Sequence, residues 1–138
     1  MGQASRSTAP CIGISGWRYR PWRGDFYPDG LTQKNELAYA SRRLNGIEIN
    51  GSFYGSQTPA RYAGWAAQTP QGFRFSVKAP RYITHVLRLR DIAEPLKHFM
   101  RSGPLCLGAR LAPFLWQFPP SFGFDPALFD DFLAQLPR

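Results

Sequence analysis

Four short segments rich in β-branched and aromatic residues recur along this chain, and a longer segment of helical character follows each one. They are residues 11–17, 46–50, 73–78 and 111–118. This alternation of strand and helix is typical of βα units, which build a parallel sheet. We therefore expect an α/β fold. The 138 residues match the usual size of one domain.

Apolar residues repeat at helical spacing after each predicted strand. The repeats are Leu37, Ala40 and Leu44; Tyr62, Trp65 and Ala66; Ile92, Leu96, Phe99 and Met100; and Leu128, Phe129, Phe132, Leu133 and Leu136. Two helix starts are marked by Thr58 before Pro59 and by Asp125 before Pro126. Thr and Asp side chains cap free N–H groups there, and proline fits the first turn.

The predicted strands have one apolar and one polar face when their residues are taken alternately. The apolar set is Ile12, Ile14, Ile47, Ile49, Phe73, Phe75 and Val77, and the opposite set is Gly13, Ser15, Trp17, Glu48, Asn50, Arg74, Ser76 and Lys78. Helices cover the apolar face, so the polar face points into the interior and mouth of a closed barrel. The strands of a doubly wound sheet are instead near-continuous apolar runs. The pattern favours a TIM-like (β/α) barrel, with an open sheet solvated on one face as the alternative.

Several ordered motifs lie on these strands and in the loops after them. They are Ile12-Gly13-Ile14-Ser15-Gly16-Trp17, Trp22-Arg23-Gly24, Phe26-Tyr27-Pro28, Ile47-Glu48-Ile49-Asn50, Phe53-Tyr54, Gly72-Phe73-Arg74-Phe75, Val77-Lys78-Ala79-Pro80-Arg81, Ile83-Thr84-His85 and Leu115-Trp116-Gln117-Phe118-Pro119-Pro120-Ser121-Phe122. Together they resemble the YecE-like family, domain of unknown function 72, from about Cys11 to the C-terminus. The resemblance implies a TIM-like (β/α) barrel of unassigned biochemical activity.

We expect only the first four βα units of such a barrel, that is, a half-barrel. A TIM barrel has eight strands and typically about 250 residues, and the later family motif resembling Glu-Phe-Arg-His is not in this sequence. Residues 11–138 would form the N-terminal half of the barrel domain, after a flexible N-terminal segment, residues 1–10. Unpaired edge strands are templates for association. The chain is therefore expected either to be a fragment of a longer protein or to pair with another copy.

The active site of TIM-barrel enzymes lies at the carboxyl ends of the strands and in the loops that follow. This rule selects Ser15, Trp17 and Tyr19 after the first strand, Glu48, Asn50 and Tyr54 after the second, Lys78, Arg81 and His85 after the third, and Gln117 on the fourth. We expect these side chains to converge on one mouth.

Glu48, Lys78 and His85 are the catalytic candidates. A carboxylate inside an apolar strand needs a partner, so Glu48 is expected to pair with Lys78. Glu48 would act as general base, Lys78 would hold an anionic group and His85 would donate a proton. The structural alternatives are an ion pair that ties two strands together and a solvated loop histidine.

The other candidates would bind substrate. Asn50 and Gln117 carry amides suited to orienting a sugar hydroxyl, a phosphate or a nucleobase. Trp17, Tyr19 and Tyr54 would stack against a ring, or alternatively close the top of the core. The best hypothesis is acid/base or hydrolytic chemistry on an anionic, phosphate- or sugar-containing substrate.

The positive charge of the chain supports a second hypothesis. The net charge is +8, and nine of the 17 Lys and Arg residues lie between residues 60 and 110. Two loops would supply an arginine rim: Arg18, Arg20 and Arg23 in one, and Arg81, Arg88 and Arg90 in the other. Such a rim would bind nucleic acid or phosphate without catalysis. Ordinary solvated arginines and an inactive truncated fragment are the alternatives.

We predict no cofactor and no metal. The two histidines have no metal-ligand spacing, and neither a P-loop nor a dinucleotide-binding glycine motif is present. Cys11 and Cys106 are expected to be reduced thiols. Without an apolar span or signal sequence, we expect a cytoplasmic protein with no membrane contact.

Overall fold

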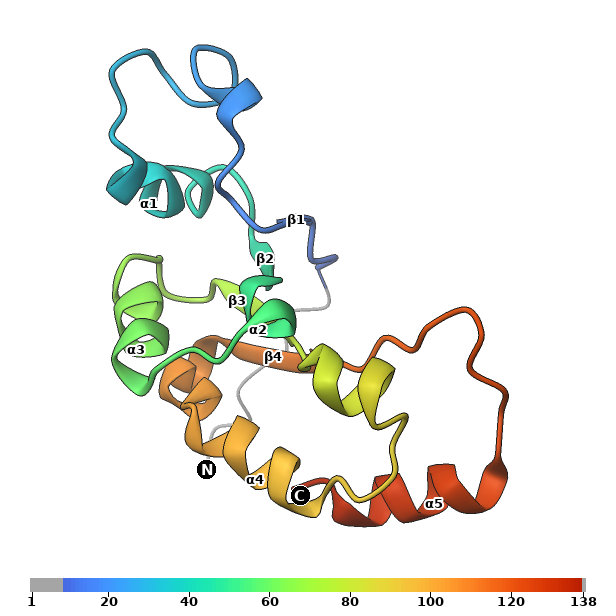
Figure 1. Ribbon diagram of the computed structural model, residues 1–138. Coiled ribbons are helices and arrows are strands. Elements are labelled where there is room, and N and C mark those ends of the chain that lie inside the picture. The colour runs from blue at the N-terminus through green and yellow to red at the C-terminus, as the bar shows by residue number, and fades with distance from the viewer. Residues whose placement is uncertain (1–8, 138) are drawn as a thin grey trace.

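The structure, a computed structural model, describes residues 9–137 and contains one parallel sheet. Its strands are β1 (Gly13–Ser15), β2 (Gly46–Ile49), β3 (Arg74–Lys78) and β4 (Leu111–Leu115), in the spatial order β1-β2-β3-β4. Each strand is parallel to its neighbour in sequence (Figure 1). The predicted α/β fold with a four-stranded parallel sheet is confirmed. Most of the segment predicted to be flexible, residues 1–8, lies outside the described residues.

Helices and helical turns connect and flank the strands. They are α1 (Glu36–Ala40), α2 (Gly51–Tyr54), α3 (Pro59–Ala67), α4 (Ala93–Arg101) and α5 (Pro126–Gln135), the 3-10 turns η1 (Arg20–Trp22), η2 (Gln33–Asn35) and η4 (Pro104–Arg110), and the π-helical turn η3 (Tyr82–Val86). In Figure 1, α1 lies near β1 and β2, and α3 lies near β3. None of the helices within residues 9–137 is long and apolar enough to cross a membrane.

Both predicted helix caps are present. The Thr58 hydroxyl accepts a hydrogen bond from the backbone N–H of Arg61 at 3.3 Å. The Asp125 carboxylate accepts one from the backbone N–H of Leu128 at 3.2 Å. Each cap satisfies an N–H group that has no partner inside its own helix.

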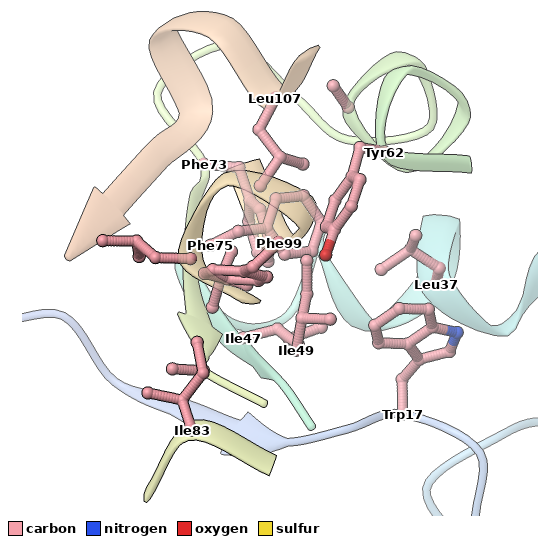
Figure 2. Close-up of a cluster of buried hydrophobic side chains, with 14 of the residues drawn as sticks. Trp17, Leu37, Ile47, Ile49, Tyr62, Phe73, Phe75, Ile83, Phe99 and Leu107 are labelled. Atoms are coloured by element: carbon pink, nitrogen blue, oxygen red, sulfur yellow. The ribbon is translucent and has the colours of Figure 1, made fainter. Parts of the chain in front are cut away.

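The core lies on one side of the sheet, as the alternating pattern of β2 and β3 predicts. Ile47, Ile49, Phe75 and Val77 are buried, whereas Glu48, Ser76 and Lys78, which alternate with them, are only partly buried. Helical segments cover the apolar side and contribute Tyr62, Phe99 and Leu107 to the same cluster (Figure 2). Within residues 9–137, the opposite side of the sheet is left open.

Strand β1 ends two residues earlier than predicted, and this changes the position of Trp17. Gly16 has a φ of 73°, a left-handed conformation that glycine adopts at little cost. The turn breaks the alternation of faces, so Trp17 is not on the polar face. It is buried in the core, with its ring 5.3 Å from that of Trp65 and 6.5 Å from that of Phe75.

Strand β4 lies at one end of the described sheet and carries an irregularity. Phe75 pairs with Leu111 and Val77 with Phe114, so β4 has one extra residue at this point. Pro113 lies within the irregularity. A proline cannot donate a ladder hydrogen bond, and it is tolerated at edge strands and bulges.

Candidate functional site

The open side of the sheet forms a polar hollow with Glu48 in it. The hollow has a volume of about 800 Å³ and is lined by Ser15, Glu48, Arg74 and Ser76 together with backbone and apolar groups of all four strands. The Ser15 hydroxyl donates a hydrogen bond to Oε1 of Glu48 at 3.1 Å. Two predicted site residues from neighbouring strands are therefore joined on this side of the sheet.

The expected ion pair between Glu48 and Lys78 does not form between these two described residues. The register of the sheet explains why. Glu48 is paired with Ser76, and Lys78 lies two residues further along β3. The Lys78 ammonium instead lies 4.2 Å from the centroid of the Phe53 ring, a cation–π contact.

Lys78 and His85 meet at the same ring. His85 packs edge-on against Phe53 with a centroid separation of 5.1 Å, and its Nδ1 is 2.8 Å from the Thr84 hydroxyl. His85 belongs to the π-helical turn η3, a type of turn often found at functional sites. Two of the three catalytic candidates thus contact one ring, whereas Glu48 hydrogen-bonds to Ser15 in the hollow.

A second cavity of about 330 Å³ lies at the carboxyl ends of β1 and β2. Three of the predicted binding residues, Trp17, Tyr19 and Asn50, line it. The Tyr19 hydroxyl donates to the carbonyl oxygen of Ser15, which fixes the loop after β1. Oδ1 of Asn50 is buried and has no hydrogen-bond partner within residues 9–137. A buried amide oxygen without a partner is costly and is suited to accepting a hydrogen bond from a ligand.

Two arginines give this second cavity a positive lining. Arg18 follows β1, and Arg61 lies in the first turn of α3, where its Nη1 donates to Oε1 of Gln57 at 3.0 Å. The described residues that line the cavity include no Asp or Glu. Sequence reasoning did not select Arg61 or Gln57. One signal was available in the sequence. Arg61 lies three residues after Thr58, the cap of the helix that follows β2.

The remaining predicted binding residues lie elsewhere, so the candidates do not share one cavity. Tyr54 and Arg81 line a third cavity of about 210 Å³ between α2, η3 and α4. Tyr54 is exposed rather than closing the core. Gln117 is exposed in the segment after β4.

The predicted arginine rim is interrupted by local contacts. Arg23 forms an ion pair with Glu36, and Arg88 donates to the carbonyl oxygen of Ser121 at 2.9 Å. In addition, β2 lies between β1 and β3, so the two arginine-bearing loops do not follow adjacent strands. The ion pair with Glu36 offsets the charge of Arg23, whereas the hydrogen bond to Ser121 orients Arg88 and leaves its charge in place.

Cys11 and Cys106 are free, exposed thiols. Within the described residues, His, Cys, Asp and Glu side chains do not gather in a group of three that could hold a metal ion.

Comparison with known proteins relates this chain to a family. The model of the family described as protein of unknown function DUF72 matches residues 11–138. The UPF0759 protein YecE of Escherichia coli strain K12 is 33% identical over 129 residues, covering 91% of this chain and 44% of the relative. The UPF0759 protein YunF of Bacillus subtilis is 30% identical over 119 residues, covering 80% and 40%.

A solved structure has a similar fold. The crystal structure of a DUF72 family protein from Enterococcus faecalis matches with a TM-score of 0.70 and 22% identity, covering 91% of this chain and 45% of that chain. The present chain therefore spans less than half the length of the relatives it matches.

Proposed function

This chain belongs to the DUF72 family, and from that premise we propose that it supplies four βα units of a TIM-like barrel with an anion-binding mouth. The one-sided core supports the barrel, because the polar side of the sheet is hollow, as the interior of a closed barrel would be. The matched relatives are more than twice as long as the matched segment. The remaining strands would come from a second half of that kind or from a second copy of this chain.

We infer that the ligand is a hydroxylated anion of the phosphate- or sugar-containing class. The cavity at the ends of β1 and β2 carries this inference. The guanidinium groups of Arg18 and Arg61 suit a phosphate or carboxylate, and the unpaired Oδ1 of Asn50 suits a hydroxyl donor. A sugar phosphate would satisfy all three groups, and the volume of about 330 Å³ is adequate for a small ligand.

For the chemistry, we propose acid/base or hydrolytic catalysis with the roles set out above. Val77 pairs with Ile49, so Lys78 follows β3's pairing with β2 by one residue, as Asn50 does on the β2 side. Lys78 would then hold the anion near the cavity, and His85 beside the same Phe53 ring would donate a proton. Glu48, two residues before Asn50, would be the base. Glu48→Gln would then abolish turnover and leave binding intact.

The experiment is calorimetric titration of the full chain with ribose 5-phosphate, ribose, inorganic phosphate and a single-stranded oligonucleotide. We expect ribose 5-phosphate to bind most tightly. Arg18→Ala and Arg61→Ala should each weaken it about tenfold, as expected for the loss of a charge-assisted hydrogen bond. Arg101→Ala, an equal charge change at an exposed position on α4, should have no effect.

Each outcome of this titration decides between the alternatives. Loss of affinity for ribose 5-phosphate but not for inorganic phosphate in Asn50→Ala would support the assigned hydroxyl contact. Binding of the oligonucleotide without ribose 5-phosphate would overturn the small-molecule proposal and favour the non-catalytic nucleic-acid module. Absence of all binding would favour an inactive fragment.

A further inference from the structure

The third cavity, of about 210 Å³, lies between α2, α3, η3 and α4. Its lining includes the aromatic side chains of Tyr54, Tyr82 and Phe99. Aromatic walls of this kind pack well against a planar ring. The proposed anion site is a separate cavity at the ends of β1 and β2.

Three buried hydroxyl groups line the same cavity. Ser52 donates to the carbonyl oxygen of Lys78 at 2.6 Å, and Ser102 donates to that of Phe99 at 2.6 Å. Both serine protons are therefore used, while their oxygen lone pairs remain available as acceptors. The cavity can accept a hydrogen bond at either serine.

The third hydroxyl, that of Tyr62, is completely buried and has no hydrogen-bond partner in the described part of the chain. Burial raises the pKa of Tyr62, and the nearby hydroxyls of Ser102 and Ser52 partly offset that rise. A tyrosine hydroxyl is neutral at physiological pH, so it keeps a proton to donate. Figure 2 shows the Tyr62 side chain among the buried apolar groups. An unpaired buried hydroxyl costs free energy, which a suitable ligand atom would recover.

The cavity is larger than the space a bare ring needs. A dry cavity of about 150 Å³ is enough to bind benzene, so about 210 Å³ accommodates a six-membered ring with small substituents. The cationic side chain that lines it is Arg81, and none of the described lining residues is acidic. An anionic substituent is favoured beside this side chain.

We propose that this cavity binds a small hydroxylated aromatic carboxylate, of the hydroxybenzoate class. The ring packs between the aromatic walls. Its hydroxyl accepts from Tyr62, which gives that buried group a partner, and donates to the oxygen of Ser52 or Ser102. Its carboxylate lies at Arg81. The hydroxyl end of the ligand is thus recognised by Tyr62 and a serine, and the carboxylate end by Arg81.

The test is titration of the full chain with 4-hydroxybenzoate, benzoate and 4-hydroxybenzyl alcohol, followed calorimetrically. We expect 4-hydroxybenzoate to bind at least about tenfold more tightly than either analogue, since each lacks one recognised group. Tyr62→Phe should remove the preference for 4-hydroxybenzoate over benzoate while benzoate still binds. Arg81→Gln should remove the preference over the alcohol.

A matched variant separates this site from the proposed anion site. Arg18→Ala should weaken ribose 5-phosphate and leave 4-hydroxybenzoate unchanged. If Tyr62→Phe does not fold, the double variant Ser52→Ala/Ser102→Ala provides the comparison, because it removes both acceptors for the ligand hydroxyl and keeps Tyr62. Equal affinities for the three aromatic ligands in the unmodified chain would overturn the proposal, as would an unchanged preference for 4-hydroxybenzoate over benzoate in whichever of these variants folds.

Discussion

Nε of Arg23 donates a hydrogen bond to Oε1 of Glu36 at 2.8 Å, and the Glu36 side chain is fully buried. Arg23 lies in the loop after β1 and Glu36 is the first residue of α1, so the contact ties this loop to the helix. The other carboxylate oxygen, Oε2, has no partner among the described residues. The buried charge of Glu36 therefore depends strongly on Arg23.

Removal of Arg23 should destabilise the fold. Arg23→Ala leaves a buried carboxylate without its cation, and we expect the free energy of unfolding to fall by about 2 kcal/mol. This is less than the usual cost of breaking a fully buried pair, because the Arg23 side chain is 34% exposed. Urea denaturation monitored by circular dichroism measures the change. Lys97→Ala is the control, since the Lys97–Glu94 pair is equally short at 2.7 Å but exposed, and its loss should have no measurable effect. Equal effects of the two variants would contradict this prediction.

The stability of the fold should also depend on pH through Tyr27. Burial, followed by the charge of Glu36, raises the pKa of Tyr27 from 10.0 to about 12. The neutral phenol donates to the carbonyl oxygen of Trp17 at 2.5 Å. Because the folded state holds this proton more tightly, the stabilisation is complete below pH 10 and is lost as the pH rises through about 12.

Urea denaturation from about pH 8 to pH 12 would reveal this loss. We expect the free energy of unfolding to decline above about pH 10 and to decline less steeply in Tyr27→Phe. Burial also raises the pKa of Tyr62, which is present in both the unmodified chain and Tyr27→Phe. The difference between their pH-dependent free energies of unfolding therefore reports on Tyr27. Identical slopes would show that ionisation of Tyr27 is not coupled to folding.

The fold was predictable wherever short-range patterns determine it. Alternation in β2 and β3 located the buried face, and the residues Thr58 and Asp125 located two helix starts. The position of Trp17 was not predictable by a period of two, because the positive φ of Gly16 ends the strand and redirects the chain. Local backbone conformation overrode the pattern at that point.

The candidate site was less predictable, because it depends on contacts between strands. The register places Ser76 opposite Glu48, and no property of either strand alone specifies that alignment. Arg61 reaches the cavity at the ends of β1 and β2 from α3, a helix that the sequence places after β2. The contact between Arg88 and Ser121 was not predictable for a similar reason, since the two residues lie far apart in the sequence.

The open edges of the sheet lead to a prediction about association. Strands β1 and β4 end the described sheet, so one side of each has no neighbouring strand there. Such rows of N–H and C=O groups pair readily with another strand. Two copies placed with β1 of one beside β4 of the other would close a ring of parallel strands. We expect size-exclusion chromatography with light scattering to give twice the mass of a single chain.

A charge at this edge should separate the copies. Ile12, just before β1, is 65% exposed, and Ile12→Lys places an ammonium beside the edge, where lysine opposes strand pairing. Leu105→Lys is the matched control, because Leu105 is 61% exposed but lies in η4. We expect Ile12→Lys to be monomeric and Leu105→Lys to remain a dimer. A folded monomer of the unmodified chain, with a cooperative unfolding transition, would rule out closure by a second copy and leave a longer chain as the source of the missing strands.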